Sequence, residues 1–539
     1  MATPSKYTYD MPPGTDILDK DGKEHSVHYP MPSGSLHDPL VWKKSYKTVT
    51  YWLMIVWTFV ATLPLIAVSS IYGTLITEYG MPPNEISQVG AWNNLALALA
   101  GFVLLPYASA YGRRPMLLAS NLVYIAGVIW VTQTHTPRMF LWSRNLNNVG
   151  AGAIEVIGLC LTGDMYFTQQ AGKYHALGFL PLIIATNIGS PILGAFDQHG
   201  VGWRNFFWMC AGLAIALEVA MFFFLSETLW HRTNASARGH VVEKVGAATD
   251  VDQDSLDDEA QKHAESRTED VTESTLTAEQ AAIIANVGKG YPSKQQRFGV
   301  FPPRNKNYTV IQNFRDILAL STFAPVALFA LWWAAIGGSA TAQGYVAAQI
   351  WAAPPYLFTP SEVGMTNIPP TIGILIGLLV AGPVVDWDVA RQAKRNRGVR
   401  EPEMRLRVAI GGGLVCILGL MIYGIGLQHQ WHWAAVLIPG MGLNQFAGAF
   451  VIAAASSYAT DVYKQFPIEI AFITTIVKNL WVFALGYFIN DLYTNDGALK
   501  CITIVSIPLF VAVVLTVVCL WVGKPARRFS ARFAIMQRE

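Results

Sequence analysis

Polar side chains follow one face of the apolar segment 144–164, whose sequence is RNLNNVGAGAIEVIGLCLTGD. On a helix that turns about 100° per residue, Arg144, Asn148, Glu155 and Thr162 fall within a wedge of roughly 80°. A carboxylic acid held away from water keeps its proton more readily than a solvated one, so Glu155 is predicted to bind and release a proton. It could instead bind a cation, or form a static ion pair or hydrogen bond between helices.

A second ionisable residue, Lys478, lies inside the apolar segment 467–492, with Asn479 beside it and Trp481 on nearly the same face. A lysine surrounded by hydrocarbon must have an anion nearby or lose its proton. Glu155 could supply the negative charge, and so could a transported anion. A purely structural pair is the alternative.

These residues must be positioned by long apolar elements. The chain has 539 residues, of which 52% are hydrophobic and 14% are charged, whereas soluble proteins carry about 25% charged residues. A helix that crosses a bilayer needs roughly 20 apolar residues. Twelve stretches meet this need, which predicts an all-α membrane protein. Their approximate spans are 48–70, 88–110, 115–133, 139–165, 174–197, 203–226, 319–347, 362–386, 405–427, 432–461, 467–492 and 499–522.

A polar stretch, 227–318, separates the first six spans from the last six. Its middle part, TDVDQDSLDDEAQKHAESRTED, is acidic and contains no aromatic residue, so we expect a largely disordered linker. The predicted organisation is an N-terminal tail, a six-helix bundle, the linker, a second six-helix bundle and a basic C-terminal tail. These parts cover residues 1–47, 48–226, 227–318, 319–522 and 523–539.

Lysines and arginines collect in alternate loops, and such loops stay in the cytoplasm. The loop after the second span contains Arg113 and Arg114, and the loop 387–404 is rich in both residue types, whereas 71–87 and 348–361 contain neither. An even number of spans then places both termini, the linker and the basic loops in the cytoplasm, and we expect the plasma membrane.

Several function classes find no support in the sequence. The formal net charge of +2 does not favour nucleic acid as a partner. The five cysteines lie in apolar segments without paired spacing, so neither disulfides nor a metal site is expected. No phosphate-binding loop is present, and no enzyme activity or cofactor is predicted.

The stretch LPYASAYGRRP (105–115) joins the second and third spans. It resembles the loop signature of the major facilitator superfamily, which reads Gly, three residues, Asp-Arg, one residue, then Gly-Arg-Arg or Gly-Arg-Lys. Gly112, Arg113 and Arg114 match its end, while Leu105 and Ser109 replace the glycine and the acid. The second half keeps the Gly-x-x-x-Asp spacing in AGPVVDW (381–387), as internal repeats would.

Other stretches narrow this resemblance to the fungal drug:proton antiporter branch with twelve helices. They are DPLVWKKSYK (38–47), WRNFFW (203–208), SETLW (226–230), RNRGVREPEMRL (395–406), SSYATDVYKQFPIEI (456–470) and KNLWVF (478–483). The resemblance implies two pseudo-symmetric six-helix bundles and cytoplasmic gates of ionic contacts. The predicted gating residues are Arg113, Arg114, Asp164, Asp386 and Asp461. Anchoring of Arg113 and Arg114 to anionic lipid is the alternative for that loop.

In the superfamily the first, fourth, seventh and tenth helices line a central cavity. Polar and aromatic residues on those helices suit an amphiphilic organic solute, although hydrogen bonding between helices is the alternative. The predicted substrate-binding residues are Thr58, Thr62, Arg144, Asn148, Glu155, Trp332, Gln343, Asn444, Gln445 and Lys478.

The function that these residues predict is proton-coupled secondary active transport by alternating access. We expect export of a small organic molecule, such as a drug, a toxin or an acid metabolite, by a monomer embedded in the lipid bilayer. Proton-symport uptake of an organic cation is the second hypothesis, with Glu155 binding the substrate. A nutrient receptor that does not transport is a third.

Overall fold

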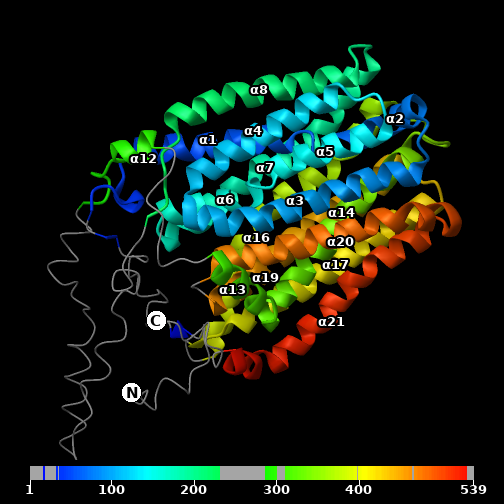
Figure 1. Cartoon of the computed structure of the whole chain (residues 1–539). Coiled ribbons are helices and arrows are strands. Elements are labelled where there is room, and N and C mark those ends of the chain that lie inside the picture. Colours follow the sequence, from blue (N-terminus) through cyan, green and yellow to red (C-terminus); the bar gives the residue numbers. More distant parts are fainter. Residues whose placement is uncertain are drawn as a thin grey trace, which may run out of the picture.

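The computed structural model describes residues 16–17, 32–33, 35–230, 286–299, 310–396, 399–463 and 466–530. Long helices lie side by side and run nearly the whole length of the molecule (Figure 1). Most of the predicted linker 227–318 lies outside these residues. The parts of it that are described, 227–230, 286–299 and 310–318, include short helices.

The first half contains nine helical elements. They are α1 (Lys44–Thr62), η3 (Ala67–Ile71), α2 (Tyr72–Tyr79), α3 (Pro83–Tyr111), α4 (Arg113–Thr132), α5 (Pro137–Ala151), α6 (Ile154–Met165), α7 (Thr168–Gln198) and α8 (Trp203–Phe224). A 3-10 turn, η2 (Pro39–Val41), precedes them, and α12 (Lys294–Phe298) and α13 (Val310–Ser321) follow. In Figure 1 this half forms the upper layer.

The second half forms the lower layer of Figure 1. Its elements are α14 (Ala324–Trp351), α15 (Pro360–Met365), α16 (Ile368–Arg395), η4 (Pro402–Arg405), α17 (Leu406–Gln428), α18 (Trp433–Val436), the π-helix η5 (Leu437–Gly442), α19 (Leu443–Val462), α20 (Pro467–Asp496) and α21 (Ala498–Ser530). Two short strands, β1 (Asp16–Ile17) and β2 (Val399–Arg400), pair antiparallel.

Eleven helices in the described residues are long and apolar enough to cross a membrane. The twelfth predicted crossing, 139–165, corresponds to α5 and α6, which are separated by a break at Gly152 and Ala153. Gly152 lies against α3, because an added Cβ there would come within 3.2 Å of the Leu97 carbonyl oxygen. The polar residues and this break explain why the segment is not one of the eleven long apolar helices.

Several helices extend past their predicted ends. For example, α16 continues to Arg395 rather than ending at 386, and α21 continues to Ser530 rather than ending at 522. The extra turns of α21 are held by Arg527, whose Nε and Nη2 donate to the two carboxylate oxygens of buried Glu403 at 2.8 Å. A charge held by a partner inside the protein allows a helix to continue beyond its apolar stretch.

Backbone contacts join the halves at the end where α7 stops and α15 begins. An added Cβ on Gly194 would lie 2.7 Å from the Pro360 carbonyl carbon, and one on Gly364 would lie 2.6 Å from Pro191 Cα. Nearby, the Ser87 hydroxyl of α3 donates to the Gly486 carbonyl of α20 at 2.9 Å. Toward the other end, the Phe102 ring stacks on Phe472 with centroids 6.3 Å apart.

Candidate functional site

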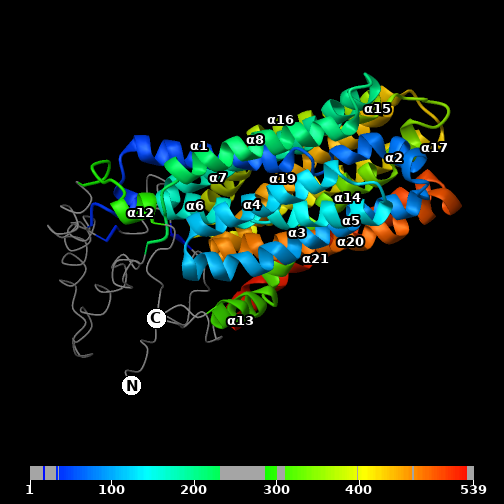
Figure 2. The same ribbon diagram turned by 45° about the horizontal axis from the view of Figure 1, so that its top comes forward.

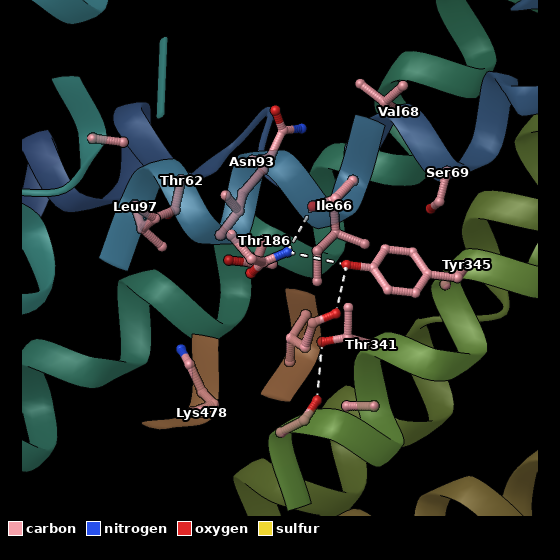
Figure 3. Close-up of a pocket in the computed structure, with 18 of the residues that line it drawn as sticks. Thr62, Ile66, Val68, Ser69, Asn93, Leu97, Thr186, Thr341, Tyr345 and Lys478 are labelled. Atoms are coloured by element: carbon pink, nitrogen blue, oxygen red, sulfur yellow. Dashed lines mark hydrogen bonds between the residues drawn. The ribbon is translucent and has the colours of Figure 1, made fainter. Parts of the chain in front are cut away.

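A cavity of about 200 Å³ lies between the two halves, midway along the helices. The first half lines it from the α1–η3 region, α3, α5 and α7, and the second half lines it from α14 and α20. Figure 3 shows Asn93 and Thr186 from the first half and Tyr345 and Lys478 from the second around the same space. The cavity therefore exists only where both halves meet.

Arg144 lines the cavity and is completely buried. α1 ends at Thr62, and the carbonyl groups of Pro64 and Leu65 lie in the turn between α1 and η3, outside a regular α-helix. Arg144 Nη2 donates to the carbonyls of Pro64 and Leu65 at 2.9 and 3.2 Å, and its Nη1 donates to Asn147 Oδ1 at 3.2 Å. The guanidinium thus holds the break in the first crossing helix open toward the cavity.

Lys478 brings a second cation to the lining from the opposite half. Its stem packs on Gly337, where an added Cβ would lie 2.9 Å from Lys478 Cγ. Its Nζ lies 5.9 Å from the centre of the Trp333 ring, within range of a cation–π interaction. Only a residue as small as glycine at position 337 lets this side chain run along α14.

Three buried polar atoms of the lining residues have no hydrogen-bond partner in the described part of the chain. They are Asn93 Oδ1, Arg144 Nε and Trp333 Nε1. Buried polar groups are nearly always hydrogen-bonded, so unpartnered ones call for an explanation. Two of these atoms are donors and one is an acceptor, which fits a small polar organic molecule or water as their partner.

The proteins that this chain resembles share one family. The sequence model of one family, described as the Major Facilitator Superfamily, matches residues 54–484. The chain belongs to the Major Facilitator Superfamily. It is 21% identical to Protein HOL1 of Saccharomyces cerevisiae, covering 94% of this chain and 91% of that protein. It is 22% identical to the probable efflux pump mfs2 of Aspergillus flavus, covering 75% of this chain and 84% of that protein. This is a transporter family, and the chain is a multi-pass membrane protein rather than an enzyme.

Solved structures of this superfamily share the fold. The xylose transporter XylE from E. coli, in a partially occluded inward open conformation, aligns with a TM-score of 0.57 at 12% identity, covering 87% of this chain and 97% of that one. A peptide transporter, POT, aligns with a TM-score of 0.55 at 12% identity, covering 90% and 95%. The two-bundle fold predicted from the sequence is confirmed.

Three of the predicted substrate-binding residues, Thr62, Arg144 and Lys478, line the cavity. Glu155 lies in the first turn of α6, but its side chain is outside the described residues. The proton-coupling role of Glu155 therefore remains a prediction.

The other predicted binding residues are buried in the helix packing and do not belong to the cavity lining. Asn148 Nδ2 donates to the Arg144 carbonyl, and Trp332 Nε1 donates to the Thr516 hydroxyl at 2.9 Å on the far side of α14. Asn444 Nδ2 donates to the Cys416 carbonyl within the second half. Thr58, Gln343 and Gln445 are also buried outside this lining.

The predicted gating residues of the first half meet at the start of α4. Arg113 Nε lies 3.2 Å from Asp164 Oδ2, and its Nη1 donates to the Ser109 hydroxyl at 3.1 Å. Arg114 instead donates to the carbonyls of Gly299 and Phe222 at 2.7 and 2.6 Å. Ser109, which replaces the acid of the superfamily signature, therefore still contacts the arginine of the following turn.

The second half has a corresponding cluster at the start of α17. Arg405 Nε lies 2.8 Å from Asp461 Oδ2, and its Nη1 lies 3.4 Å from Asp386 Oδ1. Arg400 adds a contact to Asp461 at 3.4 Å. Each of these ion pairs, like that of Arg113, joins elements of the same half, so their rearrangement during gating is a prediction.

A carboxylate that the sequence analysis missed completes the junction of the first half. The carboxylate oxygens of Glu227 accept from the backbone N–H groups of Arg113 and Arg114 at 2.9 and 3.0 Å. Burial raises the pKa of Glu227, and the backbone hydrogen bonds oppose that rise. A helix N-terminus has free N–H groups and a partial positive charge, so an acidic residue is favoured there. The sequence did not indicate that this acid would come from a position 113 residues further along the chain.

The cavity residues that the sequence analysis missed are polar or aromatic. They include Tyr72, Asn93, Asn94, Trp333, Thr341 and Tyr345. The adjacent asparagines in the apolar span 88–110 were a usable signal, because amides are rare in hydrocarbon unless they have a partner. Asn94 Nδ2 donates to the Tyr345 hydroxyl at 3.3 Å, which links the two halves across the cavity.

Proposed function

We propose that this protein is a proton-coupled secondary active transporter that moves a small organic molecule across the membrane by alternating access. One observation carries the proposal: a cavity between the two halves, lined by polar groups from both of them. A site shared between two rigid bundles opens to one side or the other when the bundles rock.

The contacts at the two ends of the cavity suit such a motion. At the end of α7 and α15 the halves touch through glycine backbone, and a Ser87–Gly486 hydrogen bond closes the adjacent α3–α20 pair. At the opposite end, Phe102 packs on Phe472 and on Phe314 of α13. Apolar and small-residue contacts can separate without leaving a charge unpaired.

The lining favours a substrate that carries hydrogen-bond acceptors. Arg144, Lys478 and the unpartnered Trp333 Nε1 are donors, and the aromatic rings of Tyr72 and Trp333 offer apolar surface. A carboxylate or carbonyl on a small organic acid, drug or toxin would match these groups. The proposal therefore prefers such a molecule to an organic cation.

The direction and the driving ion are further parts of the proposal. Export is suggested by the similarity to the probable efflux pump mfs2. Glu155, in the first turn of α6, is our candidate for carrying the proton, because the adjacent break at Gly152 and Ala153 places that turn next to the cavity-lining Ala151. We place the protein in the plasma membrane as a monomer, with both termini in the cytoplasm.

Flux across proteoliposomes tests the proposal. The full chain, reconstituted into vesicles, should exchange a radiolabelled organic acid when a pH gradient is imposed, and a panel of acids, amines and neutral drugs should rank acids first. Glu155→Gln should abolish acceleration by the pH gradient while leaving binding intact. Lys478→Gln should weaken binding of the acid at least tenfold.

A matched control uses Lys500, an exposed lysine of α21 that pairs with Asp496 away from the cavity. Lys500→Gln should bind and transport as the wild type does. Binding without flux in any gradient would show a receptor rather than a transporter. Normal proton-driven flux in Glu155→Gln at every pH would remove that residue from the coupling step.

A further inference from the structure

Two segments far apart in the sequence form a small folded unit at the end of the bundle where α1 begins. They are residues 35–44 and 286–299, which we call the clasp. Trp42 and Gly290 form a parallel backbone bridge, and the N–H groups of Gly288 and Gly290 both donate to the Val41 carbonyl at 2.9 Å. The Lys43 N–H donates back to the Gly290 carbonyl at 2.9 Å.

The clasp has its own core. Leu40, Val41 and Trp42 are at most 1% exposed, and Asp38 is fully buried, accepting from the N–H groups of Ser33 and Leu40. Gly290 permits this packing, because an added Cβ would lie 2.8 Å from Val41 Cγ2 and 2.9 Å from the Val41 carbonyl oxygen. The buried apolar residues and the glycine at position 290 therefore favour the packing of the two segments against each other.

The clasp is attached to the helix bundle through the first half. The Glu227 N–H donates to the Gln296 carbonyl at 2.8 Å, and Arg114 Nη1 donates to the Gly299 carbonyl at 2.7 Å. Lys47 Nζ of α1 donates to the Leu40 carbonyl at 2.8 Å. Figures 1 and 2 both show α12 beside the ends of α1 and α8.

The outer surface of the clasp carries charge of one sign. Lys43, Lys44, Lys289, Lys294 and Arg297 are all exposed. The clasp contains one acid in its sequence, Asp38, and that residue is buried. No described carboxylate of the clasp therefore balances these cations at its surface.

Apolar side chains lie among the cations. Phe298 is 60% exposed, Tyr291 is 48% exposed and Val287 is 38% exposed. Arg297 lies over the Tyr46 and Phe298 rings, with centroids 6.0 and 5.4 Å away. Aromatic rings next to lysine and arginine are typical of surfaces that lie at the boundary between hydrocarbon and headgroups.

The neighbouring helices place the clasp at that boundary. α1 exposes Trp52 and Val56 on one face, and the last turn of α8 exposes Phe223 and Phe224. Apolar faces of this kind in a membrane protein contact lipid tails. The clasp begins where both faces end, so its cations are at the depth of the phospholipid headgroups.

We propose that the clasp is a docking surface for anionic phospholipid headgroups in the adjoining leaflet. Each lysine or arginine close to an anionic surface strengthens binding by about fivefold. The exposed rings add hydrophobic contact that a purely electrostatic partner, such as an acidic peptide, would not use. Through Gln296 and Gly299 the docked lipid would be linked to the Arg113–Arg114 turn.

Native mass spectrometry of the full chain in a neutral detergent tests this proposal, with phosphatidylserine and phosphatidylcholine added at equal concentration. The wild type should retain phosphatidylserine at least tenfold better than phosphatidylcholine, and added salt should weaken the preference. The triple variant Lys44→Gln, Lys289→Gln, Lys294→Gln should lose the preference. Because these side chains are exposed, its melting temperature without lipid should match the wild type.

The matched control neutralises three exposed cations at the end of α16, namely Arg391, Lys394 and Arg395. That variant should keep the preference within twofold. Equal losses in the two triple variants would show a general charge effect and overturn the proposal. A third outcome would also overturn the proposal: the preference for phosphatidylserine could appear only after residues 250–270 are replaced by neutral residues. That acidic segment, rather than lipid, would then be what binds the clasp.

Discussion

Gly194 of α7 lies where the backbones of the two halves touch, so replacing it with alanine tests whether this contact closes one side of the cavity. An added Cβ would lie 2.7 Å from the Pro360 carbonyl carbon and 2.8 Å from Ser361 Cα. Ordinary van der Waals contacts of a Cβ begin near 3.4 Å. Because both neighbouring atoms belong to the backbone, the halves must move apart by several tenths of an ångström or more.

Overpacking a tight contact costs about 1–3 kcal/mol. The cost applies only to the conformation in which α7 and α15 touch, so Gly194→Ala should shift the population toward the conformation open at this end. A bias of that size corresponds to a change of roughly 5–150-fold in the equilibrium between the two states.

The assay measures access to the cavity from the side of α2 and α15. Ser69 lines the cavity and is 4% exposed, so a Ser69→Cys reporter should react slowly with a membrane-impermeant maleimide in the parent protein. Cys160, Cys210, Cys416 and Cys501 are buried, and protein without the reporter gives the background. Gly194→Ala should raise the labelling rate at least fivefold.

Gly382→Ala is the matched control, because an added Cβ at that position of α16 meets no atom within 4 Å. It should leave the labelling rate unchanged. Equal rates in the two variants would refute the assignment of this contact as a closure. So would a lower melting temperature for Gly194→Ala with no gain in labelling, because the strain would then act on folding and not on the two states.

Three further predictions concern buried charge. Arg144→Gln should destabilise the protein by about 1–3 kcal/mol, because two carbonyl groups lose their hydrogen-bond donor. Thermal unfolding followed with a thiol-reactive dye measures this loss. An unchanged melting temperature would contradict the prediction. Burial raises the pKa of Glu227, so the folded state binds its proton more tightly than the unfolded state does. That contribution to stability is complete below the ordinary pKa of about 4.3 and is lost as the pH rises through the raised pKa. Wild-type stability relative to Glu227→Gln should therefore fall as the pH rises above about 4, and parallel melting curves would exclude it. Glu403→Gln should cost about 3–5 kcal/mol by leaving Arg527 buried without its anion, and the double variant Glu403→Met, Arg527→Met should recover most of the loss in the same unfolding assay.

The helices were predictable because a bilayer imposes a length and an apolar composition on every crossing. The same physics identified Arg144 and Lys478, since a charge in hydrocarbon needs a water-accessible or paired position. Sequence alone could not decide which face of α14 meets the cavity. Trp332 and Trp333 are neighbours about 100° apart, and both are flanked by apolar residues, because α14 is surrounded by protein on several sides.

The tenth crossing illustrates a different limit. Asn444 was predicted to face the cavity, but it hydrogen-bonds to Ser339 and to the Cys416 carbonyl inside the second half. The π-helix Leu437–Gly442 lies immediately before it. Each π-type turn adds a residue and rotates all following side chains relative to an α-helix, and no simple sequence pattern marks such a turn.

The two halves use the same junction with reversed charge. In the first half the carboxylate of Glu227, just beyond the last crossing helix α8, binds the N-terminus of α4. In the second half the cation Arg527, on the last crossing helix α21, binds Glu403 at the start of α17. In both halves a charged side chain at or just beyond the end of the last crossing helix binds the segment that begins the third crossing, but the first half uses backbone N–H groups and the second half a side-chain ion pair. The described part of the clasp reaches the junction of the first half through Gln296 and Gly299, so a lipid docked on the clasp would act on that half directly.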